Sequence, residues 1–374
     1  MKKKLVIITT VPISLKFFKG QIGVLKDSFD IELISSPGPE LEAIGISEGV
    51  KVHAVPMKRD VSIVSDIISV FVLARVLSKI KPDMVHGSTP KAGLLSMLVS
   101  FVLRIKVRVY YVHGLRYDGL SGKKKSLIKN LERVSCKRAT HVYAVSFGVR
   151  EHLQNDKITT KPIQIIHNGS VNGLDLAYFD HTIITKDDIT LKSSDFVYGF
   201  VGRLVKDKGI NELVSAFVRI NRIHPNTRLV LVGQYENELD PLQESTKKEI
   251  EENENIIFRG FQSDVRPALC EFNVFVFPSY REGFGVSLME ALAMEVPAIS
   301  SNIIGCNEII IDGHNGLFIS PKNEDDLYEK MRKIYEDKDL YVRLKTNCRD
   351  HITAKYDQSK LWESTLESYK YITQ

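Results

Sequence analysis

The chain has 374 residues, more than a single hydrophobic core usually organises, so we expect two domains. Hydrophobic residues make up 43% and charged residues 26%, as in an ordinary soluble globular protein, which excludes a largely disordered chain. The net charge of +5 is mild, and no basic run with interleaved aromatic residues indicates nucleic-acid binding. A phosphate-bearing ligand or an anionic membrane would suit so small an excess of positive charge.

The first residues superficially resemble a secretory signal, because three lysines precede the apolar run at residues 5–8. That run is too short for a signal, and Pro12, Lys16 and Lys19 interrupt the stretch after it, so we interpret the run as a buried strand. Residues 94–103 are strongly apolar, but a spanning helix needs about 20 such residues, so a buried helix is expected there.

The four cysteines show neither CxxC nor metal-ligand spacing, which favours a reducing, cytoplasmic environment.

Short apolar strands alternate with helical patterns along the first half of the chain. The strands are expected at residues 5–9, 31–35, 52–56, 84–86, 107–112, 141–145 and 163–166. This alternation predicts an α/β domain with a parallel sheet and helices on both faces, the doubly wound arrangement of Rossmann-like domains.

Turn residues break the pattern at 168–173, and a polar stretch comes next at 182–194. Strands are then expected again at 196–202, 229–232, 256–258, 274–277 and 298–300, and helical periodicity continues from Glu324 to the end. We therefore predict an N-terminal Rossmann-like domain at residues 1–180, a linker at 181–195, a second Rossmann-like domain at 196–355 and a C-terminal helix at 356–374.

Five residues of the first domain are candidates for an acceptor side or a membrane contact. His113 follows the strand at 107–112, and Thr89 and Lys91 open a helix after the strand at 84–86, so Lys91 would meet a phosphate. A histidine there can equally satisfy a backbone carbonyl, and a surface lysine is the common outcome. Phe17 and Phe18, with neighbouring lysines and those at 123–125, would form a rim for anionic lipid, or else lie in the core.

Two cations lie in the turn after the first strand of the second domain. Open α/β sheets bind ligands at the carboxyl ends of their strands, and Arg203 and Lys208 follow the strand at 196–202. A guanidinium and an ammonium group complement a diphosphate well. Solvated loop charges are the alternative interpretation.

Two carboxylates flank a glycine loop at residues 282–290, after a buried strand and at the start of a helix. Gly283 and Gly285 allow a ligand to approach the backbone closely, and the first amides of the helix attract anions. Glu282 would lie at the mouth of a pocket and Glu290 along its wall. The alternative is that Glu282 caps the helix and Glu290 is a solvated surface charge.

In order and spacing these segments resemble the retaining glycosyltransferases of the GT-B fold, family 4 (group 1), over nearly the whole chain. The strongest residues are Gly202-Arg203-Leu204, Asp207-Lys208-Gly209, Leu231-Val232-Gly233, Phe258-Arg259-Gly260, Pro278-Ser279, Glu282 through Glu290, and Gly305 with Glu308 ahead of Asp312-Gly313-His314-Asn315-Gly316-Leu317.

The resemblance implies a role for each matched residue. Arg203 and Lys208 would hold the donor's diphosphate, and Glu290 the ribose hydroxyls. Glu282 and the amides of residues 283–285 would grip the transferred sugar, which His113 would also reach. The implied site thus comprises catalytic Glu282 and His113, acceptor-side Thr89 and Lys91, and donor-binding Gly202, Arg203, Lys208, Arg259, Gly283, Phe284, Gly285, Val286 and Glu290, with residues 258–261 near the base.

The resemblance also implies two Rossmann-like domains facing a central cleft, with the last helix crossing back to the first domain. Similar family members build bacterial surface polysaccharides or glycans on a polyprenyl diphosphate, so the expected partners are a nucleotide-sugar, with UDP favoured, and a saccharide or lipid-linked acceptor. The enzyme would work in the cytoplasm or peripherally on the cytoplasmic face of the inner membrane.

No DxD-like pair lies at a strand end, so we expect no divalent metal and no other cofactor. One departure from the family is the sequence Thr9-Thr10-Val11-Pro12, where many relatives have paired glycines, and the contacts expected from that loop are in doubt.

Three other functions are alternatives to this one. A nicotinamide-dependent dehydrogenase needs G-x-G-x-x-G after a strand, and residues 283–285 lack the third glycine. A non-catalytic, two-lobed sugar-binding protein has no reason to carry two cations and a glycine loop at strand ends. A sugar-nucleotide epimerase of the same fold would convert its donor without any acceptor.

Overall fold

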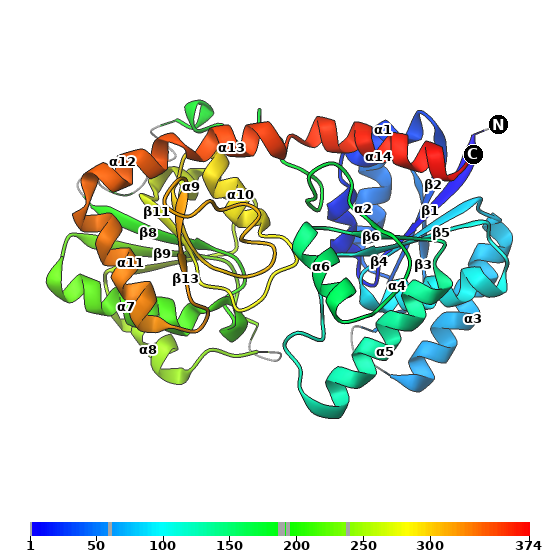
Figure 1. The fold of residues 1–374 in the computed structure, drawn as a ribbon, viewed down its shortest axis with the longest axis horizontal. Coiled ribbons are helices and arrows are strands. Elements are labelled where there is room, and N and C mark those ends of the chain that lie inside the picture. The colour runs from blue at the N-terminus through cyan, green and yellow to red at the C-terminus, as the bar shows by residue number, and fades with distance from the viewer. Residues whose placement is uncertain (1, 59–61, 186–190, 192–194, 237–239) are drawn as a thin grey trace. The chain divides into compact units, whose positions relative to one another are not determined.

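The computed structural model describes residues 2–58, 62–185, 191, 195–236 and 240–374, and the chain divides into two compact units (Figure 1). The N-terminal unit comprises Met1–Gly173 with Gln358–Gln374, and the C-terminal unit comprises Leu174–Asp357. Each unit is built around one parallel sheet, as the alternation of strands and helices predicts.

The sheet of the N-terminal unit has the strand order β3-β2-β1-β4-β5-β6-β7, and all its pairs are parallel. Its strands are β1 Lys3–Ile8, β2 Phe29–Ser35, β3 Lys51–Ala54, β4 Met84–Ser88, β5 Val107–Val112, β6 His141–Ala144 and β7 Ile163–Gln164. The apolar run at residues 5–8 is fully buried in β1, so it forms the predicted strand.

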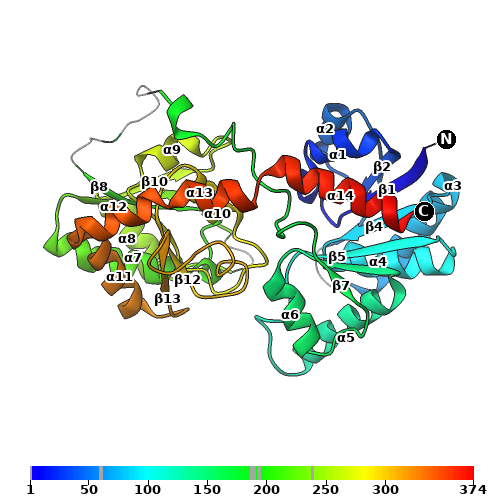
Figure 2. The same cartoon turned by 45° about the horizontal axis from the view of Figure 1, so that its top comes forward.

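The strand order reverses between β1 and β4, so right-handed crossovers put the helices on both faces of the sheet. Figure 2 shows α1 (Gln21–Lys26) and α2 (Pro39–Glu48) on one face, with α4 (Pro90–Val102) and α5 (Gly122–Arg138) on the other. The remaining helices of this unit are η1 Pro12–Phe18, α3 Ile63–Ile80, α6 Phe147–Asn155 and α14 Gln358–Ile372.

Helix α4 contains most of the apolar segment 94–103, and its Leu95, Met97 and Val99 are buried, as expected. Among the described residues, no helix combines the length and the apolar content needed to cross a bilayer.

The sheet of the C-terminal unit has the order β10-β9-β8-β11-β12-β13, again all parallel. Its strands are β8 Phe196–Val201, β9 Thr227–Val232, β10 Ile256–Gly260, β11 Val274–Phe277, β12 Ala298–Ser301 and β13 Gly316–Ile319. Its helices are η2 His181–Ile183, η4 Lys206–Lys208, α7 Ile210–Ile223, α8 Glu244–Glu252, α9 Arg266–Glu271, α10 Val286–Ala293, α11 Glu324–Glu336, α12 Lys338–Thr346 and α13 Cys348–Lys355.

The edge strand β13 was not predicted. It has four residues, begins with a glycine and follows a turn closed by a bridge between Asp312 and Gly316, so its sequence is typical of a continuing turn.

The boundary between the units lies at Gly173, earlier than the predicted boundary at residue 180. The segment 174–180 is held by the C-terminal unit: the Leu174 amide donates to Tyr356 O at 2.7 Å. The Arg349 guanidinium donates to Phe179 O at 2.6 Å and to Leu176 O at 2.9 Å. Most of the predicted linker, residues 186–190 and 192–194, lies outside the described residues.

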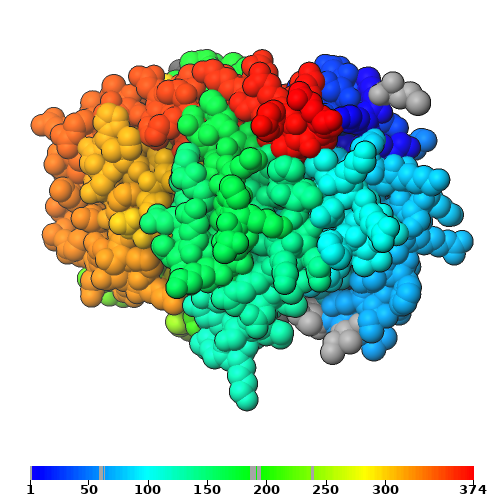
Figure 3. Space-filling model, turned by 45° about the vertical axis from the view of Figure 1, so that its right-hand side comes forward, coloured from blue at the N-terminus to red at the C-terminus, as the bar shows by residue number. Residues whose placement is uncertain are grey.

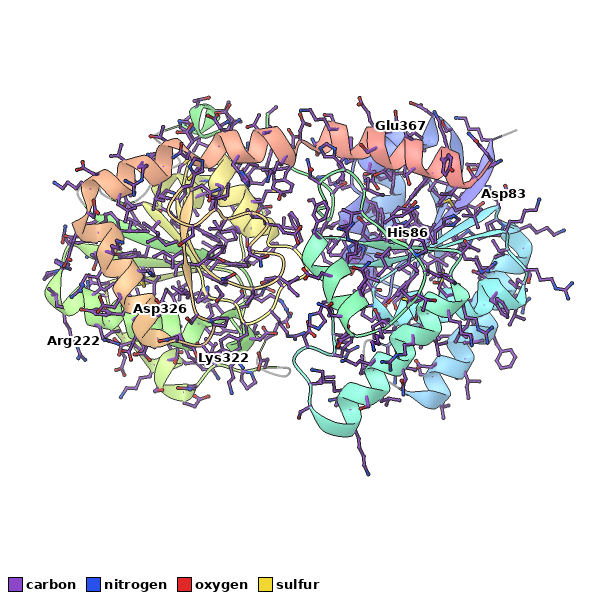
Figure 4. All side chains as sticks on the ribbon, in the orientation of Figure 1. Asp83, His86, Arg222, Lys322, Asp326 and Glu367 are labelled. Carbon is purple, nitrogen blue, oxygen red and sulfur yellow. The ribbon has the colours of Figure 1, made fainter. Side chains whose placement is uncertain are left out.

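The last helix, α14, belongs to the N-terminal unit and begins at Gln358, two positions after the predicted start at 356. The Tyr369 hydroxyl lies 2.5 Å from Nδ1 of His86, a buried residue of β4 that Figure 4 labels. The Trp362 indole N–H donates to the Asn172 side chain at 2.8 Å. These side-chain contacts fix α14 to the unit that contains β1 to β7.

Candidate functional site

The turns after β8 and β11 approach each other closely in the C-terminal unit. Gly209 ends the turn after β8 with φ +72°, and a Cβ atom there would lie 2.2 Å from Pro278 O. Only glycine fits both the left-handed backbone and this distance. The close approach brings Lys208 and Glu282, predicted separately on two turns, to the same place.

Lys208 and Glu282 form an ion pair, and both side chains are mostly buried. The Lys208 ammonium also lies 5.2 Å from the centroid of the Phe277 ring, at the end of β11. A desolvated ammonium beside an aromatic face is a strong point of attraction for an anion. The lysine predicted for the diphosphate and the glutamate predicted for the sugar are therefore direct partners.

Arg203 is half exposed and donates to the Glu236 carboxylate at 2.6 Å. Glu236 lies beyond β9, on a segment aligned with the turn after β8 by the bridge between Leu204 and Tyr235. Sequence reasoning missed Glu236. The signal available was its position just beyond the carboxyl end of β9, at the edge of the sheet where ligands bind.

The glycine loop before α10 is held by Gly305. Its φ is +79°, and a Cβ atom there would lie 2.7 Å from Gly283 O. The Gly305 carbonyl accepts from the Gly285 amide at 2.9 Å, and Val286 N–H donates to Phe284 O at 3.0 Å. In this structure the Gly285 amide is therefore engaged by Gly305, because the loop folds onto that residue.

Phe284 is buried and packs edge-on against Tyr356, with ring centroids 5.4 Å apart. This contact anchors the start of α10, whose first amides have no partners within the helix. The N-terminus of α10 is thus held rigidly beside Glu282, and its partial positive charge favours an anion.

Glu290 lies one turn into α10 and is half-buried. Desolvation raises the pKa of its carboxyl group to about 8. Among the described residues, no ion pair or hydrogen bond engages that carboxyl group. At neutral pH it is mostly protonated, so it can both donate to and accept from a hydroxyl-bearing ligand.

Arg259 lies on β10, with its guanidinium on the buried Glu271 carboxylate of α9. The ion pair is part of the packing between β10 and α9. It engages the Arg259 guanidinium, which was predicted to bind the donor. Phe258 and Phe261 are exposed at the end of β10, and Phe258 packs against Tyr235 with centroids 5.0 Å apart. These rings offer a stacking surface at the segment predicted to lie near the base.

The remaining predicted donor residue, Gly202, directly follows β8, and its amide donates to Val232 O at 2.9 Å. A Cβ atom on Gly233 would lie 1.7 Å from Gly202 O, so the turns after β8 and β9 are also in close contact. All three turns of the candidate site therefore converge at one edge of the C-terminal sheet.

In the N-terminal unit, His113 follows β5 and is half-buried. Its Nε2 lies 2.5 Å from Ser88 Oγ, and its ring lies 4.7 Å from Tyr111 and 5.3 Å from Phe17, measured between centroids. Burial lowers the pKa of His113 to about 4, so the imidazole is neutral at physiological pH. Within the described part of the chain, its Nδ1 is buried and lacks a hydrogen-bond partner.

Thr89 and Lys91 are occupied by contacts within the N-terminal unit. Thr89 has φ +71°, an unusual backbone for a β-branched residue, and its Oγ1 lies 2.7 Å from Thr10 Oγ1. The Thr10 hydroxyl also accepts from the Ala92 amide at 3.1 Å. Thr10, in the loop where many relatives have paired glycines, therefore stabilises the start of α4. Lys91 is buried and lies 2.7 Å from the Asp66 carboxylate.

Of the two phenylalanines predicted for a lipid rim with Lys16, Lys19 and the lysines at 123–125, Phe18 follows the alternative interpretation and lies in the core. Phe18 is buried against His86, with centroids 5.1 Å apart, and Phe17 packs on His113. The buried Phe18 ring cannot serve as a lipid anchor, whereas Phe17 is partly exposed.

Comparison with known proteins defines the class. The chain superimposes on the crystal structure of Anabaena Alr3699/HepE in complex with UDP and glucose with a TM-score of 0.79 at 18% identity, covering 98% of this chain and 99% of that one. The two Rossmann-like units thus form a GT-B fold, as predicted.

Family profiles described as Glycosyltransferase Family 4 and Glycosyl transferases group 1 match residues 24–170 and 183–351. The capsular polysaccharide biosynthesis glycosyltransferase CapM of Staphylococcus aureus is 31% identical over 98% of this chain and 97% of its own length. The UDP-Gal:alpha-D-GlcNAc-diphosphoundecaprenol alpha-1,3-galactosyltransferase of Escherichia coli is 27% identical over 92% and 89%. The chain belongs to glycosyltransferase family 4.

Proposed function

We propose that this enzyme transfers a hexose or N-acetylhexosamine from a UDP-sugar to a hydroxyl of a polyprenyl-diphosphate-linked saccharide, with retention of the anomeric configuration, during assembly of a surface polysaccharide or glycan. The observation that carries the proposal is the convergence of Lys208, Arg203 and the N-terminus of α10 at one edge of the C-terminal sheet. The names of the S. aureus and E. coli relatives supply the choice of acceptor and nucleotide.

The chemistry asks for stabilisation of a diphosphate leaving group. When the bond from the sugar to the diphosphate breaks, negative charge grows on the phosphate oxygens, and the sugar becomes oxocarbenium-like. Fixed cations and helix amides aimed at that charge lower the barrier electrostatically. In our proposal the Lys208 ammonium and the Arg203 guanidinium leave their carboxylate partners and bind the diphosphate.

The other predicted residues keep their proposed roles. Glu290 binds the ribose hydroxyls, since it is half-buried and its carboxyl group is unpaired among the described residues. Glu282, released from Lys208, accepts from hydroxyls of the transferred sugar. His113 contacts that sugar as a neutral imidazole.

Gly202, Gly283, Phe284, Gly285 and Val286 shape the loops around the donor. Arg259, held by its ion pair with Glu271, supports the strand end near which the base is proposed to bind. Thr89 and Lys91 are proposed for the acceptor side.

We further propose that transfer needs no divalent cation, because Lys208 and Arg203 supply the positive charge that a metal would otherwise bring to the diphosphate. The enzyme is expected to act at the cytoplasmic face of the membrane that holds its acceptor. The four cysteines are free thiols, as a reducing compartment requires.

A thermal-shift panel of nucleoside diphosphates, followed by a transfer assay, tests the proposal. A ligand present at 100 times its Kd stabilises the native state by about 2.7 kcal/mol, so UDP should raise the melting temperature clearly while GDP and ADP do so less. Radiolabelled sugar should then move from the UDP-sugar to an undecaprenyl-diphosphate saccharide. Conversion of the donor in the absence of acceptor would instead indicate an epimerase.

A further inference from the structure

Helix α3 exposes an apolar stripe that nothing within the described part of the N-terminal unit covers. Val64, Ile67, Ile68 and Phe71 are 72%, 51%, 54% and 71% exposed, and they follow one another at the spacing of a single helix face. The opposite face of α3 is also apolar, with Leu73, Leu77 and Ile80 buried against the rest of the unit. A helix needs only one apolar face to pack on its own sheet, so the second face is available to another surface.

The layer of helices that contains α3 is strongly basic. Helices α3, α4 and α5 pack side by side on one face of the sheet, and together they carry ten lysines and arginines but two acids. Their net formal charge is +8, whereas the whole chain has +5. The positive charge of the protein is therefore concentrated on this layer, whose surface runs from the blue of α3 to the teal of α5 in Figure 3.

Ion pairs neutralise part of this charge, since Lys129 of α5 lies 2.7 Å from the Asp156 carboxylate, and both acids of the layer have partners. Asp66 of α3 is paired with Lys91 of α4 at 2.7 Å, and Glu132 of α5 is buried and accepts from the Tyr110 hydroxyl at 2.7 Å. Lys123 and Lys124, at the start of α5, are exposed. Leu127, which follows them on α5, is 51% exposed and adds a further apolar side chain.

The position of the stripe relates it to the acceptor side. In a parallel sheet with helical crossovers, each helix begins at the carboxyl edge of the strand before it. The stripe lies in the first half of α3, Lys123 and Lys124 open α5, and the turns that carry Lys91 and His113 follow β4 and β5 at the same edge. Apolar and basic side chains thus gather at the edge of the N-terminal unit that holds the proposed acceptor residues.

We propose that the exposed face of α3, together with the start of α5, docks on the surface of an anionic lipid bilayer. Apolar side chains along a helix that lies in the membrane plane, flanked by lysines, bind such surfaces through burial of apolar area and attraction to lipid phosphates. A second copy of the chain is the less suitable occupant, because a symmetric interface would bring the exposed Lys123 and Lys124 of one copy towards the same lysines of the other. The inference rests on the proposed function for its purpose, which is to bring the enzyme to a lipid-linked acceptor.

Vesicle flotation in the absence of donor and acceptor tests the proposal. The wild-type chain should float with vesicles of phosphatidylcholine containing phosphatidylglycerol, and raised salt should weaken this binding. Ile67→Gln with Phe71→Gln should weaken it by about tenfold or more, because two apolar anchors are lost. Ile46→Gln with Val102→Gln is the matched control: these residues are 82% and 76% exposed, on α2 and at the far end of α4, and binding should be unchanged.

Further variants separate charge from apolar contact. Lys123→Gln with Lys124→Gln should weaken binding to the anionic vesicles and leave any residual binding to pure phosphatidylcholine vesicles unchanged. All these positions are on the surface, so circular dichroism and the melting temperature should match the wild type. Wild-type protein that stays unbound, or equal binding by the α3 variant and its control, would overturn the proposal. So would a change of oligomeric state in the α3 variant with flotation intact, which would mean that another copy covers the face.

Activity measurements keep this proposal distinct from the proposed function. The α3 variant should transfer sugar to a short, water-soluble acceptor at the wild-type rate, and to an acceptor embedded in vesicles more slowly. Flotation with no transfer to any acceptor would refute the proposed function and leave the docking surface standing. Transfer that is equally fast with both acceptors in the α3 variant would refute the docking surface alone.

Discussion

Lys208 and Glu282 are ion-paired partners, although one lies in the turn after β8 and the other in the loop before α10. Each neutralises the other in the absence of a ligand. Because both side chains are mostly buried, removing either one leaves a charge without its partner in a poorly solvated place. The pair therefore links two roles that the proposed reaction keeps separate, binding of the diphosphate and binding of the sugar.

Lys208→Ala and Glu282→Ala are expected to affect catalysis similarly and nucleotide binding differently. Each should lower kcat/KM for transfer by at least about tenfold, equivalent to about 1.4 kcal/mol. Lys208→Ala should also weaken UDP binding, whereas Glu282→Ala should leave it unchanged or tighter, because the ammonium group is released. Steady-state kinetics and calorimetry measure both effects. Arg222→Ala, on the exposed surface of α7 and labelled in Figure 4, is the control and should behave as wild type.

Glu236 is expected to compete with the diphosphate for Arg203. Its removal as Glu236→Gln frees the guanidinium, so UDP should bind about two- to fivefold more tightly, in line with the modest energy of a solvated ion pair. Glu329→Gln removes the carboxylate from a comparable exposed pair with Arg332 on α11 and should have no effect. Weaker UDP binding by Glu236→Gln would mean that the carboxylate itself contacts the nucleotide.

The carboxyl group of Glu290 should make stability depend on pH. Its pKa is raised from 4.5 to about 8 in the folded protein, so the folded state holds a proton that the unfolded state has lost. This contribution is fully present below the unfolded pKa and is lost as the pH rises towards 8. Glu290→Gln cannot lose a proton, so its melting temperature should rise relative to that of the wild type as the pH increases from about 5 to about 9.

The control for this experiment is Glu244→Gln, an exposed residue in the first turn of α8. Its melting temperature should run parallel to that of the wild type over the same range. A Glu290→Gln curve that also runs parallel would mean that the carboxyl group is already ionised at neutral pH.

His113 is expected to act as a neutral side chain. Burial holds its pKa at about 4. The pH dependence of the transfer rate near pH 6.5 should therefore be the same in the wild type and in His113→Asn. The His113→Asn variant should transfer sugar at least about tenfold more slowly and bind UDP as the wild type does, since the proposed nucleotide site lies in the other unit. Wild-type transfer by this variant would exclude His113 from the reaction.

Treatment with EDTA is expected to leave transfer unchanged. In the proposed site Lys208 and Arg203 neutralise the diphosphate, so removal of trace metal should not lower the rate. A rate lost on chelation and restored by Mg²⁺ would show that a metal ion shares that task.

Sequence patterns predicted the two sheets well, because the strands are short apolar runs separated by helices and turns, and the turns at their carboxyl ends carry the candidate residues. Side-chain partners could not be predicted in this way. The pairing of Lys208 with Glu282 depends on Gly209 lying against Pro278, and the pairing of Arg203 with Glu236 depends on the alignment of two separate turns. Distances of this kind arise only once the sheet has assembled.

Burial was equally hard to predict from the sequence. Phe18 looked available for lipid and is in the core, whereas Phe71 lies in a helix that is apolar on both faces and is exposed. Periodicity identifies the apolar faces of a helix without saying which of them the sheet covers.

The most direct test of the account is a crystal structure of the enzyme with UDP. We predict that the diphosphate oxygens lie within hydrogen-bond distance of Lys208 Nζ and the Arg203 guanidinium, with the ribose at Glu290 and the Lys208–Glu282 ion pair broken. UDP bound elsewhere, or bound with that ion pair intact, would contradict the central claim.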